Sequence, residues 1–156
     1  MPGQRLAEGY EKLRRLTDQY QEKHGHRPGL FLLNMGPLIQ HKARADFTQG
    51  FFQSGGFEVI YPDGFDGPAS AADAFLASGA RVGVICSTDA NYPELVPPLL
   101  QSIKEKDSSL RVLLAGHPGE HADTFKEAGL DDFISIKSNH FETLVENLKY
   151  CGVYPS

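Results

Sequence analysis

The sequence predicts an α/β fold: a doubly wound, five-stranded parallel sheet preceded by one amphipathic helix. Three observations support this prediction. The length of 156 residues and the hydrophobic share of 40% are those of one ordinary globular domain. After residue 28, short continuous apolar runs alternate with longer helical stretches, which is typical of parallel strands joined by crossover helices. Five such runs favour the flavodoxin-like (Rossmann-like) strand order 2-1-3-4-5.

The first element is an amphipathic helix over residues 6–24. Leucines and tyrosines recur there at steps of three or four, with charged residues between them. Gly25 is a good residue for a helix C-terminus, and the Pro28-Gly29 pair cannot continue the helix. We therefore interpret residues 1–27 as a leader helix and linker, and residues 28–156 as a single domain.

The remaining elements follow in alternation. The predicted strands are residues 30–33, 57–61, 82–86, 111–115 and 133–136. The predicted helices are residues 41–54, 68–78, 93–106, 119–128 and 140–150. Glycines follow several of these helices and prolines stand near the start of others, as helix termini require. In such a sheet, ligands bind at the carboxyl ends of the strands, near the first and third strands.

Composition excludes several classes of function. The formal net charge of −5 lacks the basic surface expected of a nucleic-acid binder. No apolar run approaches the roughly 20 residues that span a bilayer, so no membrane partner is expected. Cys86 and Cys151 are far apart and form no CxxC pair, which argues against a disulfide framework or a zinc module. We expect a reducing, cytoplasmic location.

Known nucleotide and phosphoryl motifs are missing from the strand ends. The segment after the first strand, residues 34–44, has neither GxGxxG nor GxxxxGK[ST], so no dinucleotide or nucleoside triphosphate is expected there. Asn34 and Met35 stand where a receiver domain needs a pair of acids to hold a divalent cation. His117 and His121 lie four residues apart in HPGEH, but Pro118 makes His117 a loop residue, which disfavours a metal site.

The order of several phrases along residues 27–150 resembles the C-terminal cobalamin-binding domain of methylmalonyl-CoA mutase. The phrases are RPGLFLLNMG, FFQSGGFEVIY, ASGARVGVICSTDANYPELVPPLLQSI and RVLLAGHPGEHADTFKEAGLDDFISI. In cobalamin-binding members of this family, the first loop carries DxHxxG. Its histidine is the lower ligand of cobalt, its aspartate orients the imidazole, and its glycine leaves room for the nucleotide tail.

Residue by residue, the resemblance places DxHxxG on residues 39–44. His41 stands at the histidine, which makes it the candidate cobalt ligand, but Ile39 replaces the aspartate and Arg44 replaces the glycine. The family's Ser-x-Leu motif falls on residues 86–88, which makes Ser87 a vestigial cofactor contact. Its Gly-Gly pair falls on residues 115–116, so that Gly116 remains, and the glycine-rich turn after the last strand reads Lys137-Ser138-Asn139.

These departures imply a domain that no longer binds the cofactor. The family includes heterodimers in which a large subunit holds adenosylcobalamin and a related small subunit does not. The resemblance thus implies the C-terminal domain of a small subunit, with no cofactor of its own, no catalytic residue and a structural or assembly role. Its expected partners are the large catalytic subunit and the substrate-barrel domain of its own subunit. The alternative is a functional cobalamin-binding domain in which His41 is the lower ligand of cobalt.

Overall fold

The computed structural model describes residues 2–155, with side chains from residue 8 onward. Met1, Ser156 and the side chain of Leu6, which belong to predicted segments, lie outside the described residues. The strands are β1 (Gly29–Asn34), β2 (Glu58–Ile60), β3 (Val82–Cys86), β4 (Arg111–Ala115) and β5 (Asp132–Ile134). The helices are α1 (Pro2–His24), α2 (Leu38–Gln53), α3 (Pro68–Ser78), α4 (Tyr92–Lys106), α5 (Ala122–Ala128) and α6 (His140–Tyr150), with a 3-10 turn at Gly119–His121.

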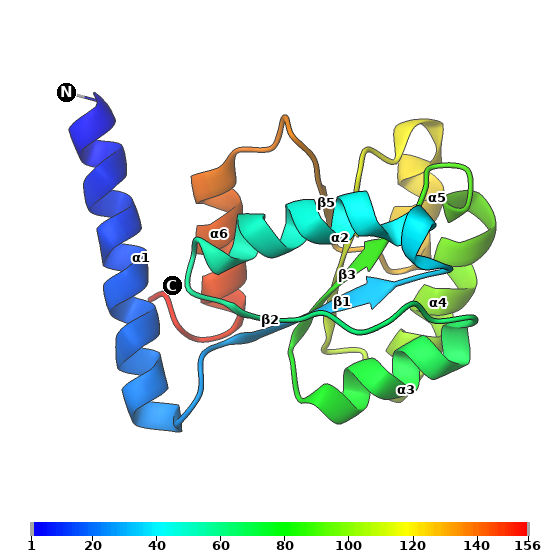
Figure 1. Cartoon of the computed structure of the whole chain (residues 1–156), viewed down its shortest axis with the longest axis horizontal. Coiled ribbons are helices and arrows are strands. Elements are labelled where there is room, and N and C mark those ends of the chain that lie inside the picture. Colours follow the sequence, from blue (N-terminus) through cyan, green and yellow to red (C-terminus); the bar gives the residue numbers. More distant parts are fainter. Residues whose placement is uncertain (1, 156) are drawn as a thin grey trace.

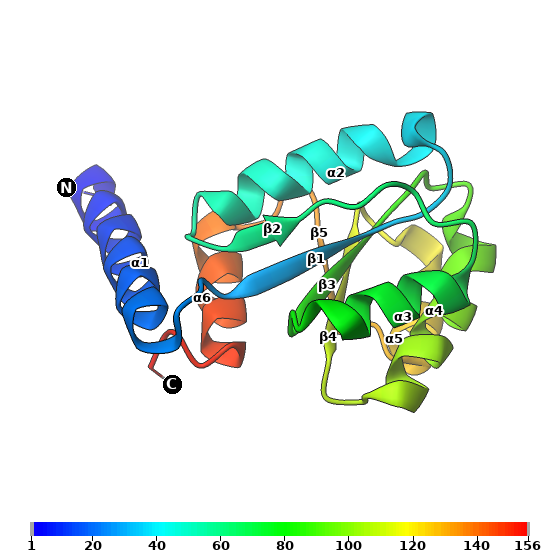
Figure 2. The ribbon, with the colours of Figure 1, turned by 60° about the horizontal axis from the view of Figure 1, so that its bottom comes forward.

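The five strands form one parallel sheet in the order β2-β1-β3-β4-β5. This confirms the predicted fold class and strand order. Figure 2 shows β1 running from beside α1 toward the point where α2 begins, so that the carboxyl ends of the strands lie away from the leader helix. Loops after β1, β3, β4 and β5 therefore meet at one edge of the sheet.

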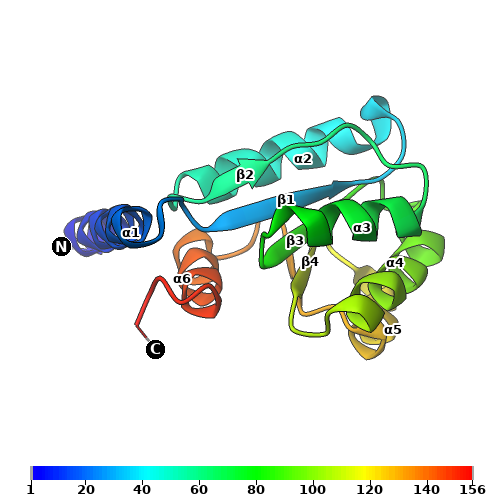
Figure 3. The same ribbon diagram turned by 90° about the horizontal axis from the view of Figure 1, so that it is seen from below.

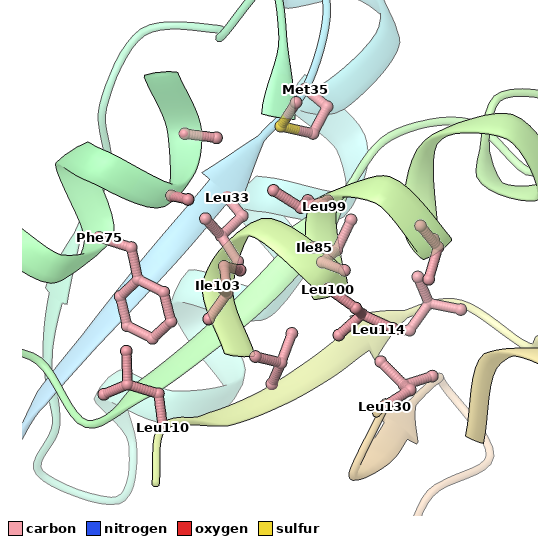
Figure 4. Close-up of a cluster of buried hydrophobic side chains, with 14 of the residues drawn as sticks. Leu33, Met35, Phe75, Ile85, Leu99, Leu100, Ile103, Leu110, Leu114 and Leu130 are labelled. Carbon is pink, nitrogen blue, oxygen red and sulfur yellow. The ribbon is translucent and has the colours of Figure 1, made fainter. Parts of the chain in front are cut away.

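Helices cover both faces of the sheet, and each face has its own buried core. One core joins the sheet to α3, α4 and α5; Leu33, Phe75, Ile85, Leu99 and Leu114 are among its members (Figure 4). The other joins the sheet to α1, α2 and α6. The central strands β1 and β3 are buried on both sides, which explains their continuous apolar sequence. Figures 1 and 3 show α1 beside α6, far from α4 and α5.

The leader helix α1 packs on this fold through one narrow face. Leu13 and Thr17 are fully buried, whereas the charged residues between them are exposed. A hydrogen bond of 2.6 Å joins the Tyr10 hydroxyl to Nδ1 of His140 at the start of α6. The other ring nitrogen of His140 lies 2.9 Å from the carbonyl oxygen of Phe51 in α2. His140 thus connects three helices. The predicted boundary between residues 27 and 28 stays a prediction.

Several element boundaries differ from the prediction, and two of these differences bear on the site and its surroundings. Helix α2 begins at Leu38 rather than at residue 41, because Pro37 takes the extended conformation of an N-cap and the helix starts directly after it. His41 is therefore a helical residue and not part of a loop. Strand β5 ends at Ile134 rather than at residue 136, since a turn closed by the Ser138 amide and the Ser135 carbonyl follows it. Ile136 is consequently 86% exposed.

Within residues 2–155, no helix combines the length and the apolar character that crossing a bilayer would require.

Candidate functional site

The candidate site lies at the carboxyl ends of the central strands, where α2 begins. The segments predicted to face a ligand follow β1, β3, β4 and β5. The structure brings the segments after β1, β3 and β4 together around one side chain, Arg44 of α2. The three predicted site residues are His41, Ser87 and Gly116, and the structure gives them different surroundings.

His41 is buried in the first turns of α2, with 1% of its surface exposed. Its Nδ1 lies 3.0 Å from the carbonyl oxygen of Gly36, and because a carbonyl only accepts, Nδ1 donates this hydrogen bond. Its Nε2 is buried and has no hydrogen-bond partner among the described residues. A Cβ added to Gly64 would lie 3.0 Å from Cε1 of His41, so the loop after β2 covers the edge of the ring.

Ile39 does not face the imidazole of His41. Its side chain is 90% exposed, and the Gly36 carbonyl rather than residue 39 orients the ring. The resemblance places the aspartate that orients the histidine at residue 39, but in this structure residue 39 lies away from the ring. The reason is geometric: both residues are helical, and positions two apart on a helix point in different directions.

Arg44 reaches across the ends of β3 and β4. Its Nη1 donates a hydrogen bond of 3.0 Å to the carbonyl oxygen of Ser87 and forms an ion pair of 2.8 Å with Asp89. Its guanidinium carbon lies 5.3 Å from the ring centroid of Tyr92. Burial alone would lower the pKa of Arg44, but the hydrogen bonds and charges of Asp89 and Tyr92 raise it above its ordinary value. The guanidinium is thus held as a cation at this edge.

Ser87 and Gly116 both contact the guanidinium of Arg44. Ser87 is fully buried at the end of β3, and its Oγ accepts a hydrogen bond of 3.0 Å from Asn91. Gly116 follows β4 with φ of 124°, a conformation that favours glycine. A Cβ at Gly116 would lie 2.9 Å from Nη1 of Arg44. Gly116, which remains of the Gly-Gly pair of the resembling family, here leaves room for an arginine.

Tyr92, at the start of α4, connects the ends of β3 and β4 in the same region. Its hydroxyl accepts a hydrogen bond of 3.0 Å from the Ser87 amide and donates one of 2.5 Å to the Ala115 carbonyl. Burial raises the pKa of this phenol, so Tyr92 stays protonated and remains a donor. Sequence reasoning missed Tyr92 because one aromatic residue before Pro93 has the pattern of an ordinary core position. Asp89, which no motif of the sequence singles out, pairs with Arg44.

A bound cobalamin does not fit this arrangement. A histidine that ligates cobalt must present a free lone pair to the metal, whereas Nε2 of His41 is covered by protein. The resemblance implies that the nucleotide tail passes where the family has a glycine, and this position holds Arg44, whose guanidinium lies beside Gly116. Among the described residues, no group of three or more His, Cys, Asp or Glu side chains could hold a metal ion, and this includes the region of His117 and His121.

Comparison with known proteins gives clear relatives. No family model matches the chain. It is 35% identical over 153 residues to the methylmalonyl-CoA mutase small subunit of Streptomyces virginiae, which covers 98% of this chain and 24% of that protein. This chain is homologous to one part of methylmalonyl-CoA mutase small subunits. The small subunit of Porphyromonas gingivalis is 34% identical over 140 residues, covering 90% of this chain and 21% of that protein.

The relatives confirm the family predicted from the sequence. A probable methylmalonyl-CoA mutase small subunit of Mycobacterium tuberculosis is also 34% identical over 151 residues, covering 97% of this chain and 24% of that protein. The chain spans about a quarter of the length of the curated relatives it matches.

Solved structures show the fold alone. The CheY-like protein TadZ from Pseudomonas aeruginosa superposes with a TM-score of 0.64 at 20% identity, covering 84% of this chain and 98% of that chain. The receiver domain of the sensor histidine kinase PA1611 from the same organism gives a TM-score of 0.57 at 11% identity, covering 80% of this chain and 98% of that chain. Both agree with the flavodoxin-like strand order.

Proposed function

We propose that this chain is the C-terminal domain of a methylmalonyl-CoA mutase small subunit and that it holds no cobalamin. Its role is structural: it contributes to the assembly of the isomerase that interconverts methylmalonyl-CoA and succinyl-CoA. The partners are the large catalytic subunit, in a cytoplasmic heterodimer, and the substrate-barrel domain of its own subunit. Adenosylcobalamin in the large subunit supplies the radical chemistry.

The observation that carries the proposal is the position of Arg44. Its guanidinium lies against the end of β3 at Ser87 and the end of β4 at Gly116. It also forms an ion pair with Asp89. These contacts occupy the space in which the resembling family admits the nucleotide tail. Homology to the small rather than the large subunit agrees with a domain that has lost its cofactor.

The proposal is tested with the complete small subunit, with and without the segment that corresponds to this chain. Each form is mixed with the large subunit and followed by sedimentation velocity. We expect the complete subunit to form a heterodimer and the truncated form to associate at least tenfold more weakly. Circular dichroism checks that the truncated form is folded. Equal association of two folded forms would contradict an assembly role.

One observation favours the alternative, a working cobalamin site. Nδ1 of His41 donates to a backbone carbonyl, which leaves the lone pair of the neutral ring on Nε2, the arrangement that metal-ligating histidines use. This alternative requires the loop after β2 to move away from His41 and Arg44 to leave Gly116. The variant Arg44→Gly removes the second obstacle. We expect it to bind no cobalamin, because Nε2 of His41 stays covered; binding by this variant would support the alternative.

A further inference from the structure

A cleft of about 410 Å³ remains open on the other side of the switch point between β1 and β3. Arg44 closes the side that faces α2, whereas this cleft lies between the segment that enters α3 and the first turns of α4. Its floor is formed by Met35 and Ser87, which are both buried. Clefts at this position of a parallel sheet commonly bind ligands. Of the residues that the cobalamin motifs occupy, only Ser87 lines this cleft; His41, Arg44 and Gly116 do not.

The walls of the cleft are apolar and carry negative charge. Phe65 and Leu95, both half-buried, supply apolar surface. Asp66 and Glu94 are exposed on two different walls, and neither forms an ion pair or a side-chain hydrogen bond within residues 8–155. Among the side chains of residues 8–155, no Lys, Arg or His lines the cleft. The cleft is therefore suited to a positively charged group on an apolar stem.

The backbone of α4 adds a further acceptor. Pro98 stands inside this helix and lines the cleft, and a proline has no N–H. The carbonyl oxygen of Glu94, four residues earlier, therefore lacks its usual helical donor. Because Glu94 and Pro98 lie on the same face of α4, this oxygen also lies on the cleft side. A carboxylate and a carbonyl of the same residue can then both accept hydrogen bonds from one cationic group.

Two exposed apolar side chains stand close in sequence to a residue of this cleft. Gly36 lines the cleft, and Leu38 and Ile39, two and three residues later at the start of α2, are 59% and 90% exposed. A free amine of low mass could not cover both the cleft and these two side chains. A protein segment could do so, with a basic side chain in the cleft and apolar residues against Leu38 and Ile39.

We propose that this cleft, together with Leu38 and Ile39, docks a segment of the large subunit that inserts a lysine or arginine side chain between Asp66 and Glu94. This inference rests on the proposed function, since it takes the large subunit as the partner. It adds the position of the contact and the chemistry of the segment that makes it.

The test compares two doubly substituted forms of the complete small subunit. In Asp66→Asn/Glu94→Gln, both cleft charges are removed. In the control Glu105→Gln/Glu127→Gln, two exposed acids outside the cleft are removed, so the net charge changes equally. We expect the cleft variant to raise the dissociation constant for the large subunit about tenfold or more, and the control to change it less than about twofold. Circular dichroism verifies that both forms are folded.

A photo-crosslinking amino acid in place of Leu95 identifies the docked segment. We expect mass spectrometry to find a large-subunit peptide that contains lysine or arginine. Unchanged affinity of the cleft variant, or crosslinks only to the remainder of the small subunit, would overturn this inference while the proposed function stands. Absence of any association with the unsubstituted small subunit would instead overturn the proposed function itself.

Discussion

Arg44 connects the ends of two central strands, and its removal tests how much that connection stabilises the fold. The variant Arg44→Ala loses the hydrogen bond to the Ser87 carbonyl and the ion pair with the largely exposed Asp89. We expect the free energy of unfolding to fall by about 1 kcal/mol in urea denaturation. The control is Lys42→Ala, which breaks the exposed ion pair with Asp46. This variant should change the free energy of unfolding by less than about 0.5 kcal/mol. If the two variants lowered the free energy of unfolding equally, Arg44 would stabilise the fold no more than an exposed ion pair does.

Tyr92 is the second residue that holds this region, through its hydroxyl. The variant Tyr92→Phe leaves the Ser87 amide and the Ala115 carbonyl without their hydrogen bonds in a buried place. We expect a loss of about 1–3 kcal/mol in the free energy of unfolding. In Tyr61→Phe, the lost hydroxyl contacts the exposed Asp46, so a change below about 0.5 kcal/mol is expected. A Tyr92→Phe variant as stable as the Tyr61→Phe variant would show that water replaces the lost bonds.

At the scale of elements, His140 determines how firmly the leader helix α1 is held. Its Nε2 donates a hydrogen bond to the Phe51 carbonyl, its Nδ1 is hydrogen-bonded to the Tyr10 hydroxyl, and its ring packs edge-on against the ring of Phe51. In His140→Ala, we expect amide hydrogen exchange in α1 to become at least tenfold faster, while exchange in α3 and α4 stays unchanged. The control is His117→Ala, an exposed loop position. Uniformly faster exchange throughout the chain would mean global destabilisation rather than release of α1.

The elements also show what the sequence could predict. Apolar periodicity identified every strand and helix, because buried parallel strands and amphipathic helices leave strong patterns. It could not predict that α2 begins at Leu38, since this depends on the conformation of Pro37. Nor could it predict the directions of Ile39 and Arg44, which follow from that helix start. The replacement of the family's glycine by Arg44 was visible in the sequence, whereas Tyr92 and the cleft beside α4 required three-dimensional contacts.

For the whole molecule, a buried thiol and a half-buried phenol predict loss of stability at alkaline pH. Burial raises the pKa of Cys86 from 9.0 to about 12, and burial with the hydrogen bond to Asp46 raises that of Tyr61 from 10.0 to about 12. The native state thus favours the protonated forms. Their contribution is fully present below pH 9 and is lost as the pH rises toward 12. The urea midpoint should fall across this range; a constant midpoint would contradict the buried environments.

Whether this domain holds cobalamin is measured on the purified chain by titration. The purified chain is titrated with adenosylcobalamin and hydroxocobalamin, followed by absorbance and by co-elution in gel filtration. The account predicts no spectral shift and no co-elution, because Nε2 of His41 is covered and Arg44 fills the space beside Gly116. A spectrum typical of histidine bound to cobalt, abolished by His41→Ala, would contradict it and make His41 a working ligand.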